Sequence, residues 1–264
     1  MGSRLGPGTV APGGVAFGAT DRRLSGVAFG ATDRRLSVWC SGLGPLRPVG
    51  WRGMSEPLPI AVLVSGAGTN LQALLETVHG QEAQVVAVAS GSPGAPALER
   101  AASRGVRTAV FERSDHPDRE ARDLAMADWL EGQGVRLVVL AGYMELLSAT
   151  FLERFPGAVM NVHPSLLPAF PGLHAIEQAL AYGVKVFGVT VHFVDAGVDS
   201  GPVILQRAVE IPGARDPDEV LRALRPLEHS LLPEAVRLFA RGALRVDLDN
   251  PRRIAIDGPV DEAS

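Results

Sequence analysis

From Pro59 onward, the sequence alternates short runs of apolar, often β-branched residues with amphipathic segments. The first run, IAVLV at 60–64, is apolar without a break, which is typical of a strand covered on both faces. This alternation predicts an α/β fold: a Rossmann-like, doubly wound, mostly parallel sheet with helices on both faces. Further strands are expected at 85–90, 107–111 and 136–141, with helices at 69–79, 95–104 and 118–132.

The last three expected strands, at 157–162, 185–194 and 202–211, follow one another without an expected helix between them. We therefore predict a mixed edge of the sheet, followed by a long helix at 216–241. In open sheets of this kind, ligands bind at the carboxyl ends of the parallel strands. The functional residues are thus expected in segments that directly follow strands.

Composition limits the classes of partner. The chain has a formal net charge of −4, which does not favour a surface for nucleic acid or membrane. It also has no apolar stretch near the ~18 residues needed to cross a bilayer. Its single cysteine, Cys40, excludes an internal disulfide and fits a reducing compartment. We expect a cytoplasmic protein that acts on small molecules, and either a monomer or a homodimer fits the sequence.

The first 53 residues differ in character from the rest of the chain. Residues 14–25, GVAFGATDRRLS, recur unchanged at 26–37, and the flanking sequence is rich in Gly, Pro, Arg and Ser without a helical or strand period. Structural repeats normally drift, so identical copies indicate a recent duplication of the DNA. Residues 1–53 are either a targeting or interaction arm or, as we prefer, an unstructured upstream extension, with one domain at 54–264 that begins at Met54.

The segment SGAGTN at 65–70 joins the first strand to the first helix. Gly66 and Gly68 allow positive φ and close approach of the backbone, while Thr69 and Asn70 are suited to capping the helix. The start of a helix also favours a bound anion. The spacing matches neither GxGxxG nor a P-loop, so a dinucleotide or ATP site is not supported. Two interpretations stay open here, a site for one phosphate and a plain tight turn.

Asn161 and His163 lie two residues apart on an expected strand, so their side chains point to the same side. Pro164 ends regular pairing, which places both residues at the carboxyl end of that strand. The Asn amide is suited to donating a hydrogen bond to a carbonyl oxygen that becomes an oxyanion, and the His to moving a proton near neutral pH. This pair therefore favours acyl chemistry.

Other routes to acyl chemistry lack support in the sequence. Ser165 follows Pro164 without a GxSxG elbow, and residues 54–264 contain no cysteine. His163, His174 and His192 are spread without the spacing of a zinc site, so no metal is expected. Direct transfer without a covalent enzyme intermediate is the remaining interpretation.

A second polar segment, VDAGVDSGP at 194–202, follows the next strand and carries Asp195 and Asp199. A carboxylate near His163 would support the charged imidazole and hold a proton through water. Both aspartates also fit a plain turn. The residues alone favour a turn role for Asp195 and leave both roles open for Asp199.

Several motifs together resemble the glycinamide ribonucleotide formyltransferases. They are VLVSGAGTNLQALL, LAGYMELLS, NVHPSLLPAFPGLHAIEQAL, GVTVHFVDAGVDSGPVILQ and EHSLLP, and they run in order through 59–240. The resemblance implies transfer of the formyl group of 10-formyltetrahydrofolate to the amine of glycinamide ribonucleotide, through a tetrahedral intermediate, in purine synthesis. No metal is implied.

The resemblance also implies roles for individual residues. Asn161 would hold the formyl oxygen, His163 would stabilise the intermediate and shuttle a proton, and Asp199 would position a water and support the charged imidazole. The substrate phosphate would bind at Gly66, Ala67, Gly68, Thr69 and Asn70, and the substrate amine at Glu228. The folate would contact Arg119, Met144, Glu145, Leu146, Leu147, Val194 and Asn161.

Two positions depart from the family pattern. Glu145 stands where relatives carry Arg, which removes a cation from the folate side, and Gly91 stands where they carry Asn. Neither position belongs to the expected catalytic group. Recognition of the folate by the backbone of this wall is expected to survive both changes.

Alternative functions share the expected fold and catalytic group. Methionyl-tRNA formyltransferase has RGAxP where this chain has PGLHAI, and it carries a further basic domain. Formyltetrahydrofolate hydrolase has an N-terminal regulatory domain, which residues 1–53 are not expected to form. A nucleotide-binding module without catalysis would leave Asn161, His163 and Asp199 without a role.

Overall fold

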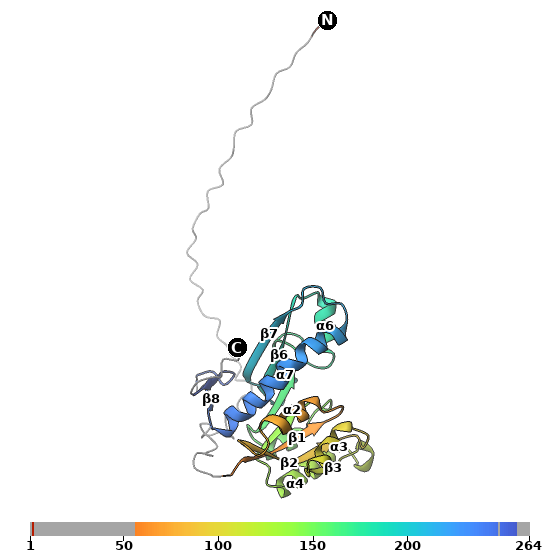
Figure 1. Ribbon diagram of the computed structural model, residues 1–264, viewed down its shortest axis with the longest axis vertical. Helices are drawn as coiled ribbons and strands as arrows, with labels where there is room; N and C mark the ends of the chain where they lie inside the picture. The colour runs from red at the N-terminus through yellow and green to blue at the C-terminus, as the bar shows by residue number, and fades with distance from the viewer. Residues whose placement is uncertain (1, 3–55, 248, 258–264) are drawn as a thin grey trace. The chain divides into compact units, whose positions relative to one another are not determined.

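The computed structural model describes Gly2, residues 56–247 and residues 249–257. The expected arm at 1–53, apart from Gly2, and the expected boundary at Met54 lie outside these residues. Within them, the main sheet has the strand order β3-β2-β1-β4-β5-β6-β7 (Figure 1). The strands are β1 (Leu58–Val64), β2 (Ala83–Ser90), β3 (Arg107–Val110), β4 (Leu137–Leu140), β5 (Val159–His163), β6 (Val186–Phe193) and β7 (Val203–Glu210).

The pairing confirms the expected mixed sheet. Strands β1 to β5 pair in parallel, whereas β6 is antiparallel to β5 and β7 is antiparallel to β6. The carboxyl ends of β1, β4 and β5, which are neighbours in the sheet, therefore lie at one edge. The loops at 65–68, 141–148 and 164–174 leave the sheet at this edge.

Helices cover both faces of the sheet, as expected. The strand β1 shows how: Ile60, Val62 and Val64 belong to one hydrophobic cluster, and Ala61 and Leu63 to the other, all without solvent exposure. The first cluster packs against α2 (Thr69–Thr77), α3 (Pro96–Ser103), α6 (Ala175–Tyr182) and α7 (Pro217–Ala240). The second packs against α4 (Arg119–Gly132) and α5 (Ala149–Arg154), and a short 3-10 helix, η1 (Arg113–Asp115), precedes α4.

The structure corrects one expected connection. The helix α6 lies between β5 and β6, so these two strands do not follow one another directly, whereas β6 and β7 do. A small two-stranded sheet formed by β8 (Leu244–Val246) and β9 (Ile254–Ile256) also lies beyond the expected elements. Among the described residues, no helix has the length and apolar character to cross a membrane.

Candidate active site

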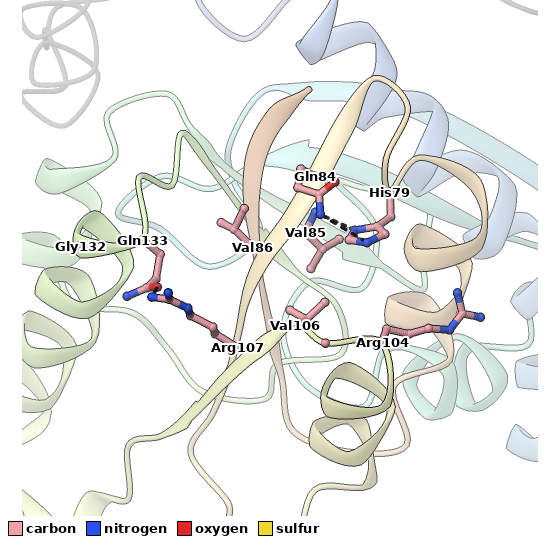
Figure 2. A pocket seen from close by; sticks show the side chains of 10 residues that line it. His79, Gln84, Val85, Val86, Arg104, Val106, Arg107, Gly132 and Gln133 are labelled. Carbon is pink, nitrogen blue, oxygen red and sulfur yellow. Dashed lines mark hydrogen bonds between the residues drawn. The ribbon is translucent and has the colours of Figure 1, made fainter. Parts of the chain in front are cut away.

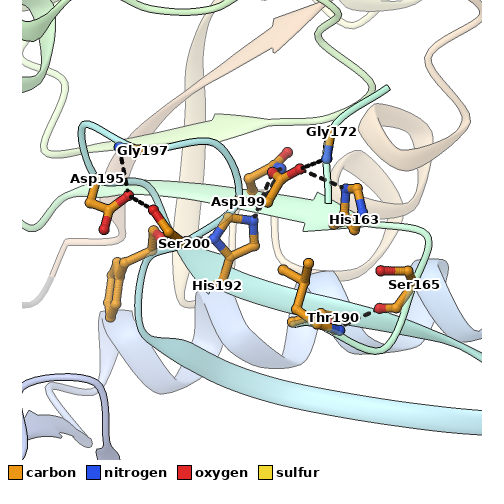
Figure 3. Close-up of polar contacts among 12 residues, drawn as sticks. His163, Ser165, Gly172, Thr190, His192, Asp195, Gly197, Asp199 and Ser200 are labelled. Atoms are coloured by element: carbon orange, nitrogen blue, oxygen red, sulfur yellow. Dashed lines mark hydrogen bonds and ion pairs between the residues drawn. The ribbon is translucent and has the colours of Figure 1, made fainter. Parts of the chain in front are cut away.

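The strand β5 presents Asn161 and His163 on the same side and ends at His163, directly before Pro164. Asn161 Nδ2 lies 3.4 Å from Asp199 Oδ1, and His163 Nδ1 lies 3.3 Å from Asp199 Oδ2. The structure therefore brings together the three residues that the sequence singled out (Figure 3 shows His163 and Asp199). Two of them come from one strand and the third from a loop that is distant in sequence.

Asp199 reaches this position because the segment after β6 folds back over β5. Phe193, the last residue of β6, pairs with Met160 near the start of β5. From there, the loop returns toward the end of β5, and Asp199 adopts a left-handed backbone with φ 47°, which Asp tolerates better than most residues. The N–H of Gly172 donates to Asp199 Oδ2 over 2.7 Å. This carboxylate thus joins the loop after β5 to the loop after β6.

Both ring nitrogens of His163 face hydrogen-bond acceptors. Nδ1 lies beside the Asp199 carboxylate, and Nε2 lies 2.9 Å from the carbonyl oxygen of Phe170. The left-handed backbone of Phe170, with φ 53°, accompanies this contact and is an unusual conformation for a bulky residue. A ring with two acceptors is suited to carrying both protons, because a carboxylate and a carbonyl only accept.

His192 also belongs to this group, although the sequence did not single it out for a role. It is buried, and Nε2 lies 3.2 Å from Asn161 Nδ2 and 3.5 Å from Asp199 Oδ1. Its Nδ1 lies 2.8 Å from the carbonyl oxygen of Phe193, so Nδ1 carries a hydrogen. In the neutral ring, Nε2 then accepts from Asn161 and orients that amide, whereas in the protonated ring Nε2 donates to Asp199 Oδ1. His192 could be assigned to this group only from the antiparallel register of β5 and β6, which pairs it with Asn161.

The environment of Asp199 favours its ionised form. Burial opposes ionisation, but hydrogen bonds from His192 and from the N–H of Gly172, together with the positive potential of both imidazoles, outweigh it and lower the pKa of Asp199 to about 2. Asp199 is therefore a carboxylate at neutral pH and is available to support a positive charge on His163.

Nearby polar residues have structural partners. Ser165 is buried, and its hydroxyl donates to the carbonyl oxygen of Ala169 over 2.6 Å, which does not fit a nucleophile. Asp195 accepts hydrogen bonds from Gly197 N and Ser200 Oγ, which supports the turn interpretation (Figure 3).

His163 and His192 converge despite their separation in sequence. Within the described part of the chain, no group of three or more His, Cys, Asp or Glu residues is arranged to hold a metal.

The loop between β1 and α2 is tightly packed against α3. Gly68 has φ 71°, and a Cβ at this position would lie 2.5 Å from the Cβ of Ala97, so both backbone angle and space require glycine. The carbonyl oxygen of Gly66 accepts from the N–H of Ala97, and that of Ala67 accepts from Arg100 Nε over 2.8 Å. Arg100, which the sequence did not single out, thus brings a guanidinium beside the loop.

The expected side-chain caps of α2 are absent. The N-cap residue is Gly68, and no side chain caps this helix. Asn70 points instead to α7, where its Nδ2 donates to Glu228 Oε2 over 3.0 Å. Both side chains are buried, and the Asn70 carbonyl oxygen Oδ1 has no partner in the structure. The structure therefore joins two of the expected substrate-binding residues that are far apart in sequence.

The segment after β4 forms an apolar wall beside this loop. Met144 and Leu146 are 65% and 58% exposed, which is unusual for side chains of this size, while Leu147 and Val194 pack against the second hydrophobic cluster. The N–H of Met144 donates to Ser65 Oγ over 3.0 Å and joins the wall to the β1–α2 loop. Glu145 forms an ion pair with Arg122, and Arg119 is exposed at the start of α4.

A pocket of about 380 Å³ lies at the other edge of the sheet, near the first residues of β2 and β3 (Figure 2). His79, Gln84, Arg104 and Arg107 contribute to its lining. Burial, with a smaller effect of Arg104, lowers the pKa of His79. None of the expected site residues lines this pocket, so it is separate from the candidate site.

Comparison with known proteins identifies the family. The formyl transferase family matches residues 58–236, which contain the whole Asn161, His163 and Asp199 group. The chain belongs to the formyl transferase family. The phosphoribosylglycinamide formyltransferase of Mycobacterium tuberculosis is 42% identical over 193 residues, which cover 73% of this chain and 89% of that protein.

Two further relatives extend this comparison. A glycinamide ribonucleotide transformylase from Symbiobacterium toebii has a solved structure with a TM-score of 0.74 and 45% identity, covering 78% of this chain and 96% of its own. A trifunctional purine biosynthetic protein of Drosophila pseudoobscura pseudoobscura is 42% identical over 199 residues, 74% of this chain. This formyl transferase spans 15% of the length of that larger relative.

Proposed function

We propose that this formyl transferase moves the formyl group of 10-formyltetrahydrofolate to the amine of glycinamide ribonucleotide, in purine synthesis. The observation that carries the proposal is the convergence of Asn161, His163 and Asp199 at the same edge of the sheet as a loop suited to phosphate and an exposed apolar wall. Family membership and the names of the full-length relatives support the same reaction. The cytoplasm, where we place the protein, is where such small-molecule substrates would be used.

In the proposed reaction, the amine nitrogen attacks the formyl carbon and a tetrahedral intermediate forms. The new C–N bond remains, and the bond between the formyl carbon and N10 of the folate breaks. The amine nitrogen loses one proton in this exchange, and N10 gains one. The Asn161 amide donates to the formyl oxygen as it gains negative charge. The His163 imidazolium stabilises the same charge and shuttles a proton, while Asp199 supports the imidazolium and positions a water.

The β1–α2 loop is suited to the substrate phosphate. The carbonyl oxygens of Gly66 and Ala67 are turned to α3, while N–H groups at the start of α2 lack partners within their own helix. Ala67, Thr69 and Asn70 complete the proposed loop, and Arg100 adds a positive charge next to it. The buried Glu228 carboxylate, held by Asn70, is suited to accepting hydrogen bonds from the substrate amine.

The wall at 144–147 is suited to a flat, partly apolar ring. Met144 and Leu146 expose large apolar side chains on the loop after β4, the strand next to β5, and the burial of these side chains under a ring system is favourable. Leu147, Val194 and main-chain groups of the wall would complete the folate contacts. Arg119, exposed on α4, would meet the carboxylate tail. No step of the proposed reaction requires a metal.

The alternative is a related reaction of the same fold, hydrolysis of 10-formyltetrahydrofolate or formyl transfer to another amine. Both use the same three residues, so the acceptor distinguishes them. The test is to incubate the purified protein with 10-formyl-5,8-dideazafolate, with and without glycinamide ribonucleotide, and to follow the folate absorbance. We expect turnover that depends on the amine. Equal turnover without it would overturn the transferase proposal in favour of the hydrolase.

A further inference from the structure

Glu145 lies directly against Gly91, although the two residues are far apart in sequence. A Cβ added at Gly91 would lie 2.0 Å from Glu145 Oε1. Gly91 follows β2 and Glu145 follows β4, so the contact joins two loops at the carboxyl edge of the sheet. The absence of a side chain at position 91 thus leaves the space that the Glu145 carboxylate occupies.

The other oxygen of this carboxylate is held by Arg122 on α4. The Arg122 side chain is only 2% exposed and pairs both with Glu145 Oε2 and, over 2.8 Å, with the fully buried Asp123. The remaining Asp123 oxygen accepts from the N–H of Ser148 over 2.6 Å. Arg122 and Asp123 therefore hold the segment 143–148 at two points, Glu145 and Ser148.

This attachment determines which side chains the segment exposes. Glu145 turns toward α4, whereas its neighbours Met144 and Leu146 turn outward and form the exposed wall. One carboxylate oxygen is bound by Arg122, and the other lies in the space beside Gly91 that a side chain there would fill. Glu145 is therefore placed to hold the wall rather than to bind a ligand directly.

We propose that Glu145 is a positioning residue: bound by Arg122 in the space left by Gly91, it holds the backbone of 143–148 in the conformation that receives the folate. Its partner Arg122 is a buried charge that Asp123 also neutralises, so loss of Glu145 removes one of its two ion pairs and releases the segment at position 145. The inference rests on the proposed function, because it assigns the wall to folate binding.

The test begins with Gly91→Ala, whose methyl group would displace the Glu145 carboxylate from Arg122. Loss of one hydrogen bond to a charged group corresponds to about a tenfold change in an equilibrium constant. We expect the KM for 10-formyl-5,8-dideazafolate to rise about tenfold, with a much smaller change in kcat. The matched control is Gly94→Ala in the same loop, where an added Cβ meets nothing within 4 Å. It is expected to leave both constants unchanged.

A double-mutant cycle separates this explanation from a non-specific disturbance of the fold. Glu145→Ala should raise the folate KM as Gly91→Ala does, and Glu145→Gln should raise it less because the amide oxygen still accepts from Arg122. Adding Gly91→Ala to Glu145→Ala should have no further effect, since the carboxylate it would displace is gone. Additive effects, or an unchanged folate KM in Gly91→Ala and Glu145→Ala, would overturn the proposal.

The same variants distinguish this inference from the proposed reaction. If the wild-type protein shows no amine-dependent transfer, the proposed function fails. Equilibrium titration with 10-formyl-5,8-dideazafolate then still measures the affinity of the wall for this analogue. Weaker binding by Gly91→Ala and Glu145→Ala, with a thermal midpoint close to wild type in Glu145→Gln, supports the positioning role. Equal affinity in all variants contradicts it, whatever the outcome of the transfer assay.

Discussion

His163 lies between a carboxylate and a carbonyl oxygen, and these two contacts fix the orientation of its ring. If it supplies a proton in the transfer, His163→Ala should lower kcat by about 10²-fold or more, because that is the usual contribution of a general acid or base. The assay with glycinamide ribonucleotide measures this. His174→Asn is the control, because His174 is exposed and Asn tolerates its left-handed backbone. An unchanged kcat in His163→Ala would remove His163 from the mechanism.

Asp199 should contribute to stability in a pH-dependent way. Its pKa in the folded protein is about 2, below the ordinary 3.8, so its contribution is complete above about pH 4 and is lost as the pH falls toward 2. Asp199→Asn should therefore lower the free energy of unfolding by about 2 kcal/mol at pH 7, and the difference from wild type should shrink between pH 4 and pH 3. Urea unfolding at these pH values measures it. A difference that stays constant down to pH 3 would contradict this account.

The sequence was sufficient for part of this group and not for the rest. Asn161 and His163 share a side because side chains alternate along a strand, which needs no knowledge of the fold. Asp199 required a family resemblance, because its loop folds back and contributes from a distance. His192 depends on the register between β5 and β6, which a single sequence does not define. Arg122 was not expected because its importance comes from a partner on another loop.

At the scale of elements, the junction of β1 and α2 depends on Gly68. Gly68→Ala should lower the free energy of unfolding by about 1 kcal/mol from the backbone angle and by a further ~1–3 kcal/mol from contact with Ala97. Gly80→Ala is the matched control, because Gly80 also has positive φ, at 77°, but an added Cβ there meets nothing within 4 Å. Urea unfolding of both variants measures the difference. Equal losses would show that α3 does not restrict this loop.

The expected elements also show where a sequence pattern is informative. The strand β1 was predicted closely because its apolar run is unbroken, and the helix α7 because it is long, even though it contains Pro226 and Pro233. The helices α5 and α6 were missed because they have only 6 and 8 residues, and α6 also follows a loop rich in Pro. Gly183, which ends α6 with φ 86°, was a signal for its C-terminus. The strands β8 and β9 have 3 residues each, too few for a clear pattern.

At the scale of the whole molecule, both described hydrophobic clusters contain only residues from Leu58 onward. The proposed catalytic group, phosphate loop and apolar wall likewise come from residues after position 64. We therefore predict that a protein starting at Met54 keeps the kcat, both KM values and the urea midpoint of the full chain, because it retains all these contacts. The comparison uses the two proteins side by side in the transfer assay and in urea. Lower activity or stability of the shorter protein would show that residues 1–53 contribute to the folded enzyme, and the duplicated block at 14–37 would then be the first segment to delete by itself.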